Sequence, residues 1–209
     1  MEEAQFFHAV LTNPVNAAII SRTGQLGLPD WWLTGGAIFQ TVWNVLDGRE
    51  PTSGIEDYDL FYFNDRDLSA ESEQLAREQA AELFSDLDAR IELCNEARVH
   101  LWYESYFGTP APEFSDARDA INHFISPVCM FAVSAGPDGN PKVYAPHGYD
   151  DLSAQIVRPN PLIAQREVYE RKSARWQREW TGLTVEPWLD AEKTLVRPFS
   201  VRNDNSRSG

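Results

Sequence analysis

Two aspartates separated by a single residue are the clearest candidates for chemistry in this sequence. Asp57 and Asp59 open the aromatic run Asp57-Tyr58-Asp59-Leu60-Phe61-Tyr62-Phe63, which has the composition of a strand. Side chains alternate along a strand, so both carboxylates point to one face while Tyr58 and Leu60 point into the core. Carboxylate oxygens suit Mg²⁺ (or Mn²⁺), and two such ions about 4 Å apart stabilise the charge that develops during nucleotidyl transfer. The pair predicts a two-metal site, whereas a solvated strand edge is the alternative reading of the pair taken alone.

A third carboxylate on a neighbouring strand would complete such a site. Glu92 lies between Ile91 and Leu93, the apolar-acid-apolar pattern of a half-buried strand, and is the candidate for this role. Glu96 is the alternative. The predicted metal ligands and catalytic residues are therefore Asp57, Asp59 and Glu92.

A glycine turn precedes the acidic pair. Thr34-Gly35-Gly36 follows the apolar run Trp31-Trp32-Leu33 and opens a helical stripe that begins at Ala37 and closes near Gly48. Glycine lets a backbone approach a phosphate closely, and the first free amides of a helix point at the anion. We expect Thr34, Gly35 and Gly36 to bind a nucleotide, although a tight turn packed against the sheet is the alternative interpretation.

The remaining elements follow from apolar spacing and turn chemistry. The first thirty residues predict two helices, the second opened by Pro14 after Asn13. The later elements expected, in chain order, are a helix over roughly residues 70 to 86, a strand over 89 to 93, a helix from Asn95 to Gly108, a short helix from Ser115, a hairpin that pairs 128 to 134 with 142 to 145, and a long helix from Pro161 with Leu162, Tyr169, Trp176 and Trp180 along one side.

The order of these motifs resembles a known signature. Leu33-Thr34-Gly35-Gly36, a helix, Asp57-Tyr58-Asp59-Leu60 and Ile91-Glu92-Leu93 are similar to the three-part pattern of the DNA polymerase β nucleotidyltransferase superfamily. The runs 97–103, 145–152 and 158–160 more closely resemble a family of small bacterial nucleotidyltransferase-like proteins of undefined substrate. The resemblance covers Trp31 to Asn160 and implies that the three acids bind metal and that the glycine pair holds a nucleoside triphosphate.

Composition argues against a long nucleic-acid partner. The chain carries 32 acidic and 18 basic side chains, a formal charge of −14, which repels a phosphate backbone. In addition, Phe39-Gln40 stands where the tRNA enzymes of the superfamily carry Arg-Asp. No stretch approaches the ~20 apolar residues of a membrane-spanning helix, and the start is acidic, so we expect a cytoplasmic protein with no membrane partner.

Basic residues offer weaker candidates. Arg98, shortly after the third acid, is a nucleotide-binding candidate, with a solvated helix face as the alternative. Arg171, Arg175 and Arg178 lie at helical spacing and form either a basic surface or ion pairs with neighbouring glutamates. Cys94 and Cys129 lie far apart without zinc-binding spacing and predict buried thiols.

The sequence therefore predicts an α/β (α+β) fold, a short mixed sheet flanked by helices, with a single domain over residues 1–190 and a polar, flexible tail over 191–209. The predicted activity is transfer of a nucleoside monophosphate from a nucleoside triphosphate to the hydroxyl of a small-molecule or protein acceptor. One alternative is a catalytically inactive nucleotide- or metal-binding module with a regulatory or interaction role. Another is a partner-binding protein that uses its 7 tryptophans as an interface.

Overall fold

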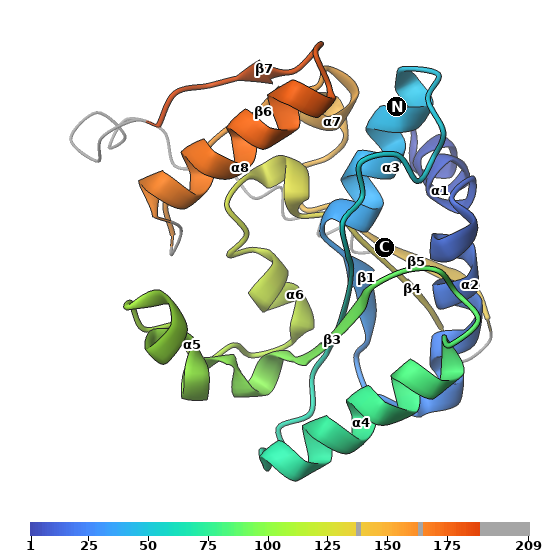
Figure 1. Ribbon diagram of the computed structural model, residues 1–209, viewed down its shortest axis with the longest axis vertical. Coiled ribbons are helices and arrows are strands. Elements are labelled where there is room, and N and C mark those ends of the chain that lie inside the picture. Colours follow the sequence, from blue (N-terminus) through green and yellow to red (C-terminus); the bar gives the residue numbers. More distant parts are fainter. Residues whose placement is uncertain (137–138, 163–164, 189–209) are drawn as a thin grey trace, which may run out of the picture.

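A computed structural model describes residues 1–136, 139–162 and 165–188 of the chain (Figure 1). The helices are α1 (Glu3–Leu11), α2 (Pro14–Arg22), α3 (Gly36–Leu46), α4 (Ala70–Leu83), α5 (Val99–Phe107), α6 (Ala117–Ile121), α7 (Asp150–Ser153) and α8 (Arg166–Glu179), with 3-10 turns η1 (Thr23–Leu26), η2 (Glu96–Arg98) and η3 (Pro127–Cys129). The strands are β1 (Trp32–Thr34), β2 (Tyr58–Tyr62), β3 (Ile91–Asn95), β4 (Ala132–Ala135), β5 (Pro141–Tyr144), β6 (Ile156–Val157) and β7 (Thr184–Val185).

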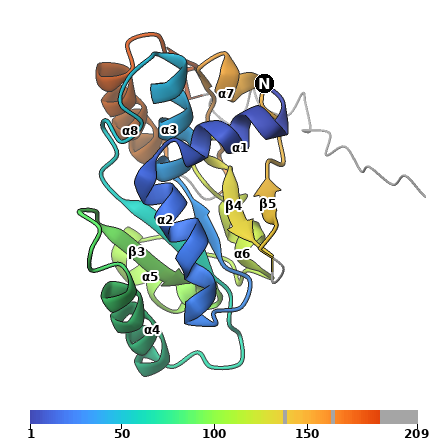
Figure 2. The same cartoon turned by 90° about the vertical axis from the view of Figure 1, so that its right-hand side faces the viewer.

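The centre of the fold is a mixed sheet of 5 strands in the order β3-β2-β1-β4-β5. Strands β2 and β3 run parallel because α4 carries the chain back between them, and the other pairs are antiparallel. Helices α1 and α2 lie on one face of this sheet, and α5 and α6 lie on the other (Figures 1 and 2). The expected short mixed sheet flanked by helices is confirmed.

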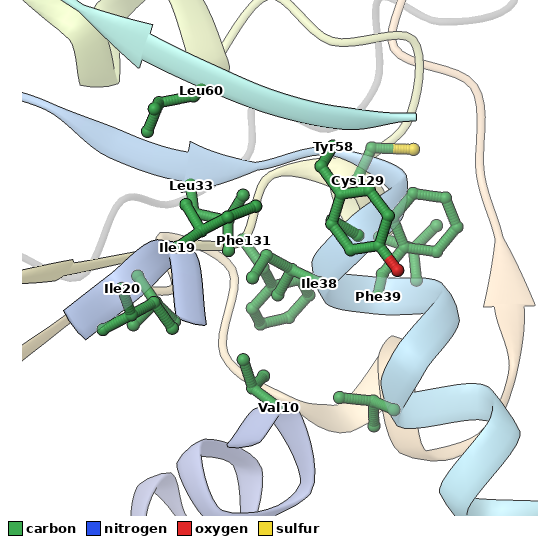
Figure 3. Close-up of a cluster of buried hydrophobic side chains, with 14 of the residues drawn as sticks. Val10, Ile19, Ile20, Leu33, Ile38, Phe39, Tyr58, Leu60, Cys129 and Phe131 are labelled. Atoms are coloured by element: carbon green, nitrogen blue, oxygen red, sulfur yellow. The ribbon is translucent and has the colours of Figure 1, made fainter. Parts of the chain in front are cut away.

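The principal core fills the space between the sheet and α1, α2 and α3. Along β2 the buried and partly exposed side chains alternate, so Tyr58, Leu60 and Tyr62 enter this core. Leu33 and Leu60 belong to the same buried cluster as Ile19 and Ile38 from the helices, and Figure 3 shows part of this cluster. The residues between them in β2, Asp59 and Phe61, therefore face the opposite side of the sheet.

The beginning of the chain follows local sequence signals. The Asn13 side chain caps α2 by accepting hydrogen bonds from the amides of Val15 (2.9 Å) and Asn16 (3.3 Å), and Pro14 takes the first helical position. The Asn13 side-chain amide also donates to Thr41 and to the Tyr58 hydroxyl. The cap therefore links α2 to α3 and to the strand that carries the aspartates.

The two largest errors in the predicted element boundaries concern the long helix and strand β4. The strand expected over 89 to 93 lies two residues later, at 91–95. The long helix begins at Arg166 and not at Pro161, because the Asn160 amide donates to the carbonyls of Asn122 (3.1 Å) and Phe124 (2.7 Å) and so does not cap a helix. Strand β4 begins at Ala132, because η3 forms a turn from Pro127 in place of the first residues of the expected strand. The predicted polar tail over 191–209 lies outside the described residues.

Most of the tryptophans belong to the core. Trp31, Trp32, Trp43, Trp176 and Trp180 are buried. The alternative of a partner-binding surface built from tryptophans therefore finds no support in these five residues. None of the described helices is long and apolar enough to cross a membrane.

Candidate active site

The three predicted acids lie on the face of the sheet that is opposite the principal core. Asp59, inside β2, is paired in register with Thr34 of β1 on one side and with Glu92 of β3 on the other. Register partners on neighbouring strands project from the same face of a sheet. Asp57 directly precedes β2, two residues before Asp59, and so shares that face. The parallel pairing of β2 with β3 is what brings Glu92 beside the aspartates.

The carboxylate of Asp59 is held in unfavourable surroundings for a negative charge. Burial and the like charges of Asp57 and Glu92 raise its pKa to about 7, while the cations of Lys172 and Arg90 act in the opposite direction. A carboxylate with this pKa, next to a second carboxylate, is stabilised by any cation that enters the site. Perturbed acids of this kind gather at functional sites more often than elsewhere.

Gly35 keeps open the space in front of Asp59. Its φ is +67°, a conformation that only glycine adopts without strain, and a Cβ built on it would collide with the Asp59 carboxylate oxygen. At the next residue, a Cβ on Gly36 would lie 2.8 Å from the side-chain nitrogen of Gln40. The turn between β1 and α3 therefore brings bare backbone against Asp59 at Gly35 and against Gln40 at Gly36.

The first turn of α3 adds hydrogen-bond donors at the same place. The amides of Ile38 and Phe39 bond back to the Gly35 carbonyl, so the amides of Gly36 and Ala37 have no partner within the helix. The helix dipole favours an anion here. Gln40 is 3% exposed, and its side-chain oxygen finds no hydrogen-bond partner in the described structure. We did not single out Gln40 from the sequence as a binding residue, because its burial depends on packing.

Thr34 and Arg98 are engaged elsewhere in the fold. The buried Thr34 hydroxyl donates to the Phe131 carbonyl (2.7 Å) and so ties β1 to the residue before β4. The Arg98 guanidinium pairs with the buried Glu73 of α4 and donates to the Leu68 carbonyl (3.0 Å). Glu73 in turn accepts from the Asn95 amide (2.9 Å). Arg98 therefore fastens the end of β3 to α4, and its predicted nucleotide binding has no support in this geometry.

The oxygen ligands fit a magnesium site in type, although they do not yet form a closed one. Within the described ranges, no group of three His, Cys, Asp or Glu side chains is arranged to hold a metal ion. Glu92 is instead turned toward Arg90, with which it forms an ion pair on the surface. Exposed pairs of this kind contribute about 0–1 kcal/mol, so the pair opposes a rotation of Glu92 toward Asp59 only weakly.

Glu96, the alternative third acid, is buried rather than solvated. It is 4% exposed, and one of its carboxylate oxygens has no hydrogen-bond partner among the described residues. Burial and, to a smaller extent, the charge of Asp59 raise its pKa to about 8, while a hydrogen bond from the Cys94 thiol acts against them. The register favours Glu92 as the third acid, because Glu92 is the residue paired with Asp59.

The basic residues of α8 divide into two groups. Arg175 forms an ion pair with Glu56, the residue before Asp57 (2.5 Å), and Lys172 is close enough to Asp59 to act on its charge. Arg171 and Arg178 are exposed, as Lys172 is. We missed Lys172 in the sequence, although its position one turn before Arg175 is visible there.

Comparison with known proteins agrees with this architecture. A family model described as nucleotidyltransferase matches residues 21–185 of the chain. A solved structure described as revealing a CCA-adding enzyme head domain is similar with a TM-score of 0.72 and 24% sequence identity, over 90% of this chain and 97% of that chain. At this identity the likeness shows the fold alone.

A second solved structure, of a tRNA-processing enzyme complex, has a TM-score of 0.42 and 15% identity, over 77% of this chain and 40% of that chain. Among curated proteins, none matches the chain.

Proposed function

Because the chain belongs to the nucleotidyltransferase family, we propose that it transfers a nucleoside monophosphate from a nucleoside triphosphate to an acceptor hydroxyl. The observation that carries this proposal is the position of Asp59, which lies between the Gly35 turn and Glu92 in the sheet register, with Asp57 on the same face. Three acids beside a glycine turn match what nucleotidyl transfer requires.

In this proposal the glycine turn binds the phosphates. The amides of Gly36 and Ala37 donate to phosphate oxygens, and the absence of a side chain at Gly35 leaves the triphosphate room to approach Asp59. Asp57, Asp59 and Glu92 would hold Mg²⁺ (or Mn²⁺), which supplies neutralising charge for the phosphates and makes the acceptor hydroxyl more acidic.

The acids also direct the transfer. The acceptor oxygen attacks the α-phosphorus, and the bond from that phosphorus to the bridging oxygen of the pyrophosphate breaks. Glu92 takes the proton of the hydroxyl once its carboxylate has left Arg90. Small molecules and protein side chains both carry suitable hydroxyls. The cytoplasmic location and the absence of a long nucleic-acid partner remain predictions of the sequence.

A second candidate function has its own observation. The ion pair between Arg90 and Glu92 leaves the site without a closed set of three carboxylates. This arrangement favours a module that binds a nucleotide or a metal ion without turnover. The experiment must therefore measure binding and turnover separately.

The test uses the wild-type protein and the variants Asp57→Asn and Asp59→Asn. Calorimetric titration with each of the four Mg²⁺-bound nucleoside triphosphates measures binding, and pyrophosphate release, with the protein itself and then a metabolite extract as acceptors, measures turnover. We expect binding and release in the wild type. Each variant should lose release by about 100-fold or more, because several kcal/mol of charge stabilisation is removed.

The exposed Asp65 on the loop after β2 provides the matched control. Asp65→Asn removes the same charge from the same segment and should retain release. Wild-type binding without release for any triphosphate would favour the non-catalytic module. The complete absence of nucleotide binding would contradict both candidate functions.

A further inference from the structure

Helix α8 contacts α3 through aromatic residues near its C-terminal end, where the two helices lie nearest to each other (Figure 1). The Trp180 indole donates to the Asn44 side chain (2.9 Å), and its ring lies 5.5 Å from that of Trp43. One turn earlier in both helices, the ring of Trp176 lies 5.2 Å from that of Phe39. One turn toward the start of α8, Lys172 lies three residues before Arg175, whose guanidinium pairs with Glu56, the residue before Asp57.

The rotation of α8 decides which side chain occupies that place. Tyr169, Ser173 and Trp176 are buried and define the face that packs on the core. At about 100° per residue, Lys172, Arg175 and Glu179 form a stripe on one flank of that face. Arg171 and Arg178 point away from the core, on the outer face of the helix.

This stripe follows the segment that leads to the aspartates. Arg49 donates to the carbonyl of Glu179 (2.9 Å) and pairs with its carboxylate, and Arg175 pairs with Glu56 (2.5 Å). Lys172 is the next member of the stripe toward the start of α8. Within the described part of the chain, Lys172 forms no ion pair, whereas Arg49 and Arg175 each form one.

The charge of Lys172 reaches the site. It lowers the pKa of Asp59 against the effect of burial, and it acts in the same direction on the Cys129 thiol, whose pKa burial raises to about 12. Both groups lie on the inner side of α8. A cation at this point stands out in a chain with a net charge of −14.

We propose that Lys172 is a phosphate-binding residue, which holds the outer phosphates of a nucleoside triphosphate from α8 while the glycine turn and the first amides of α3 hold them from the other side. This inference rests on the proposed function. An ammonium group donates up to three hydrogen bonds and acts as a point charge, which suits the several oxygens of a triphosphate tail.

The experiment uses Mg²⁺-tripolyphosphate as the probe, because this molecule has neither base nor acceptor. Calorimetric titration compares the full-length wild type with Lys172→Gln, Lys172→Arg and Arg171→Gln. We expect Lys172→Gln to weaken binding by about 10-fold or more, the loss of one charge-assisted contact. Lys172→Arg should restore most of the affinity.

Arg171→Gln is the matched control, since it removes the same charge from the adjacent, exposed position of the same helix. It should change the affinity less than two-fold, which corresponds to about 0.4 kcal/mol, because an exposed charge that does not contact the ligand contributes little to binding. Thermal unfolding of all variants checks that α8 remains in place, and a structural role alone would shift the unfolding midpoint rather than the affinity.

The outcomes separate the two proposals. If Lys172→Gln and the wild type bind equally while Asp59→Asn loses binding, the role of Lys172 is overturned and the proposed function stands. If Arg171→Gln weakens binding as much as Lys172→Gln, the effect is one of net charge and the role is again overturned. If the wild type binds neither tripolyphosphate nor any nucleoside triphosphate, both proposals fail.

Discussion

Asp59 shows how single residues set the character of this site. Its carboxylate lies among like charges on a strand, and burial and Asp57 raise its pKa to about 7. An arrangement with this electrostatic cost is maintained only where packing enforces it. Here the enforcement comes from the neighbours of Asp59 in sequence, Tyr58 and Leu60, which are buried in the principal core. The strand can rotate the aspartate away from the site only by exposing both.

Glu96 is a second acid whose pKa is raised by its surroundings, and it makes the stability of the fold depend on pH. In the fold its pKa is raised to about 8, chiefly by burial, whereas its ordinary value is 4.5. At a pH between these two pKa values, Glu96 is still protonated in the native state but ionised in the unfolded chain. The neutral carboxyl therefore contributes its full stability at low pH, and this contribution is lost as the pH rises toward the folded-state pKa.

We predict that Glu96→Gln, which cannot ionise, removes this loss. The free energy of unfolding of the wild type should fall relative to that of the variant between pH 5 and pH 8, by on the order of a few kcal/mol. Urea unfolding at both pH values measures the difference. Glu82→Gln, at an exposed position of α4, is the control and should follow the wild type. A constant difference between Glu96→Gln and the wild type across this range would show that Glu96 is not held neutral.

We predict that Gly35→Ala damages the turn between β1 and α3. A Cβ there meets the Asp59 carboxylate while φ is +67°, so we expect a loss of about 1–3 kcal/mol in the free energy of unfolding, together with weaker triphosphate binding. Gly24→Ala is the control, because its Cβ would meet nothing within 4 Å, and it should be neutral or slightly stabilising. Denaturant unfolding of both variants checks this, and equal stability of the two would be incompatible with the geometry described for Gly35.

At the scale of elements, the site is formed between two units that are far apart in the sequence. The crossover β2-α4-β3 aligns the acids, and α8 supplies a flank from more than 70 residues further along the chain. Tyr169 fixes the start of α8 by donating to the carbonyls of Val157 (3.1 Å) and Glu186 (2.6 Å). Trp176 fixes its middle against Phe39 and Trp43.

The anchor of α8 can be tested by itself. Trp176→Ala should cost about 3–5 kcal/mol of stability, because it empties a buried site between α8 and α3. Tripolyphosphate binding should weaken as well, since the helix that carries Lys172 is no longer held in position. Gln177→Ala, at the adjacent exposed position, should lie within about 0.5 kcal/mol of the wild type. Unfolding and tripolyphosphate titration on the same samples measure both effects. If a folded Trp176→Ala protein bound tripolyphosphate as the wild type does, the packing of Trp176 would not be needed to position Lys172.

At the scale of the whole molecule, charge limits the choice of partner. The net charge of −14 repels polyanions, while the local cation of Lys172 favours the charged form of Asp59. A short, metal-neutralised triphosphate avoids most of the repulsion that a long strand would meet. The fold of a CCA-adding enzyme head domain is therefore compatible with a substrate that is not a nucleic acid.

We predict that the protein does not bind transfer RNA or single-stranded RNA at about 0.15 M salt, because the surface lacks the basic excess that supplies non-specific affinity. Filter binding at that salt, and again at about 0.02 M, measures this. Retention at the lower salt also tests for a local basic patch, and the double variant Arg171→Gln and Arg178→Gln identifies whether the outer flank of α8 forms it. Tight binding at 0.15 M salt would reverse the expectation about partners.

The sequence by itself determined the local features of this protein. Alternation along β2 put Asp57 and Asp59 on one face, glycine chemistry defined the turn at Gly35, and the Asn13 cap began α2 where expected. These features depend on steric and hydrogen-bonding preferences of neighbouring residues, which the order of residues specifies directly.

Only the tertiary structure decided which distant residues meet. The pairing of β2 with β3 selects Glu92 rather than Glu96 as the partner of Asp59, the burial of Glu73 draws Arg98 to α4, and the packing of α8 brings the charge of Lys172 close enough to act on Asp59. The start of α8 was misjudged for the same reason, since Asn160 bonds to a turn that lies far from it in sequence. Such contacts depend on how buried surfaces fit together across the whole core, and no local spacing of residues specifies that fit.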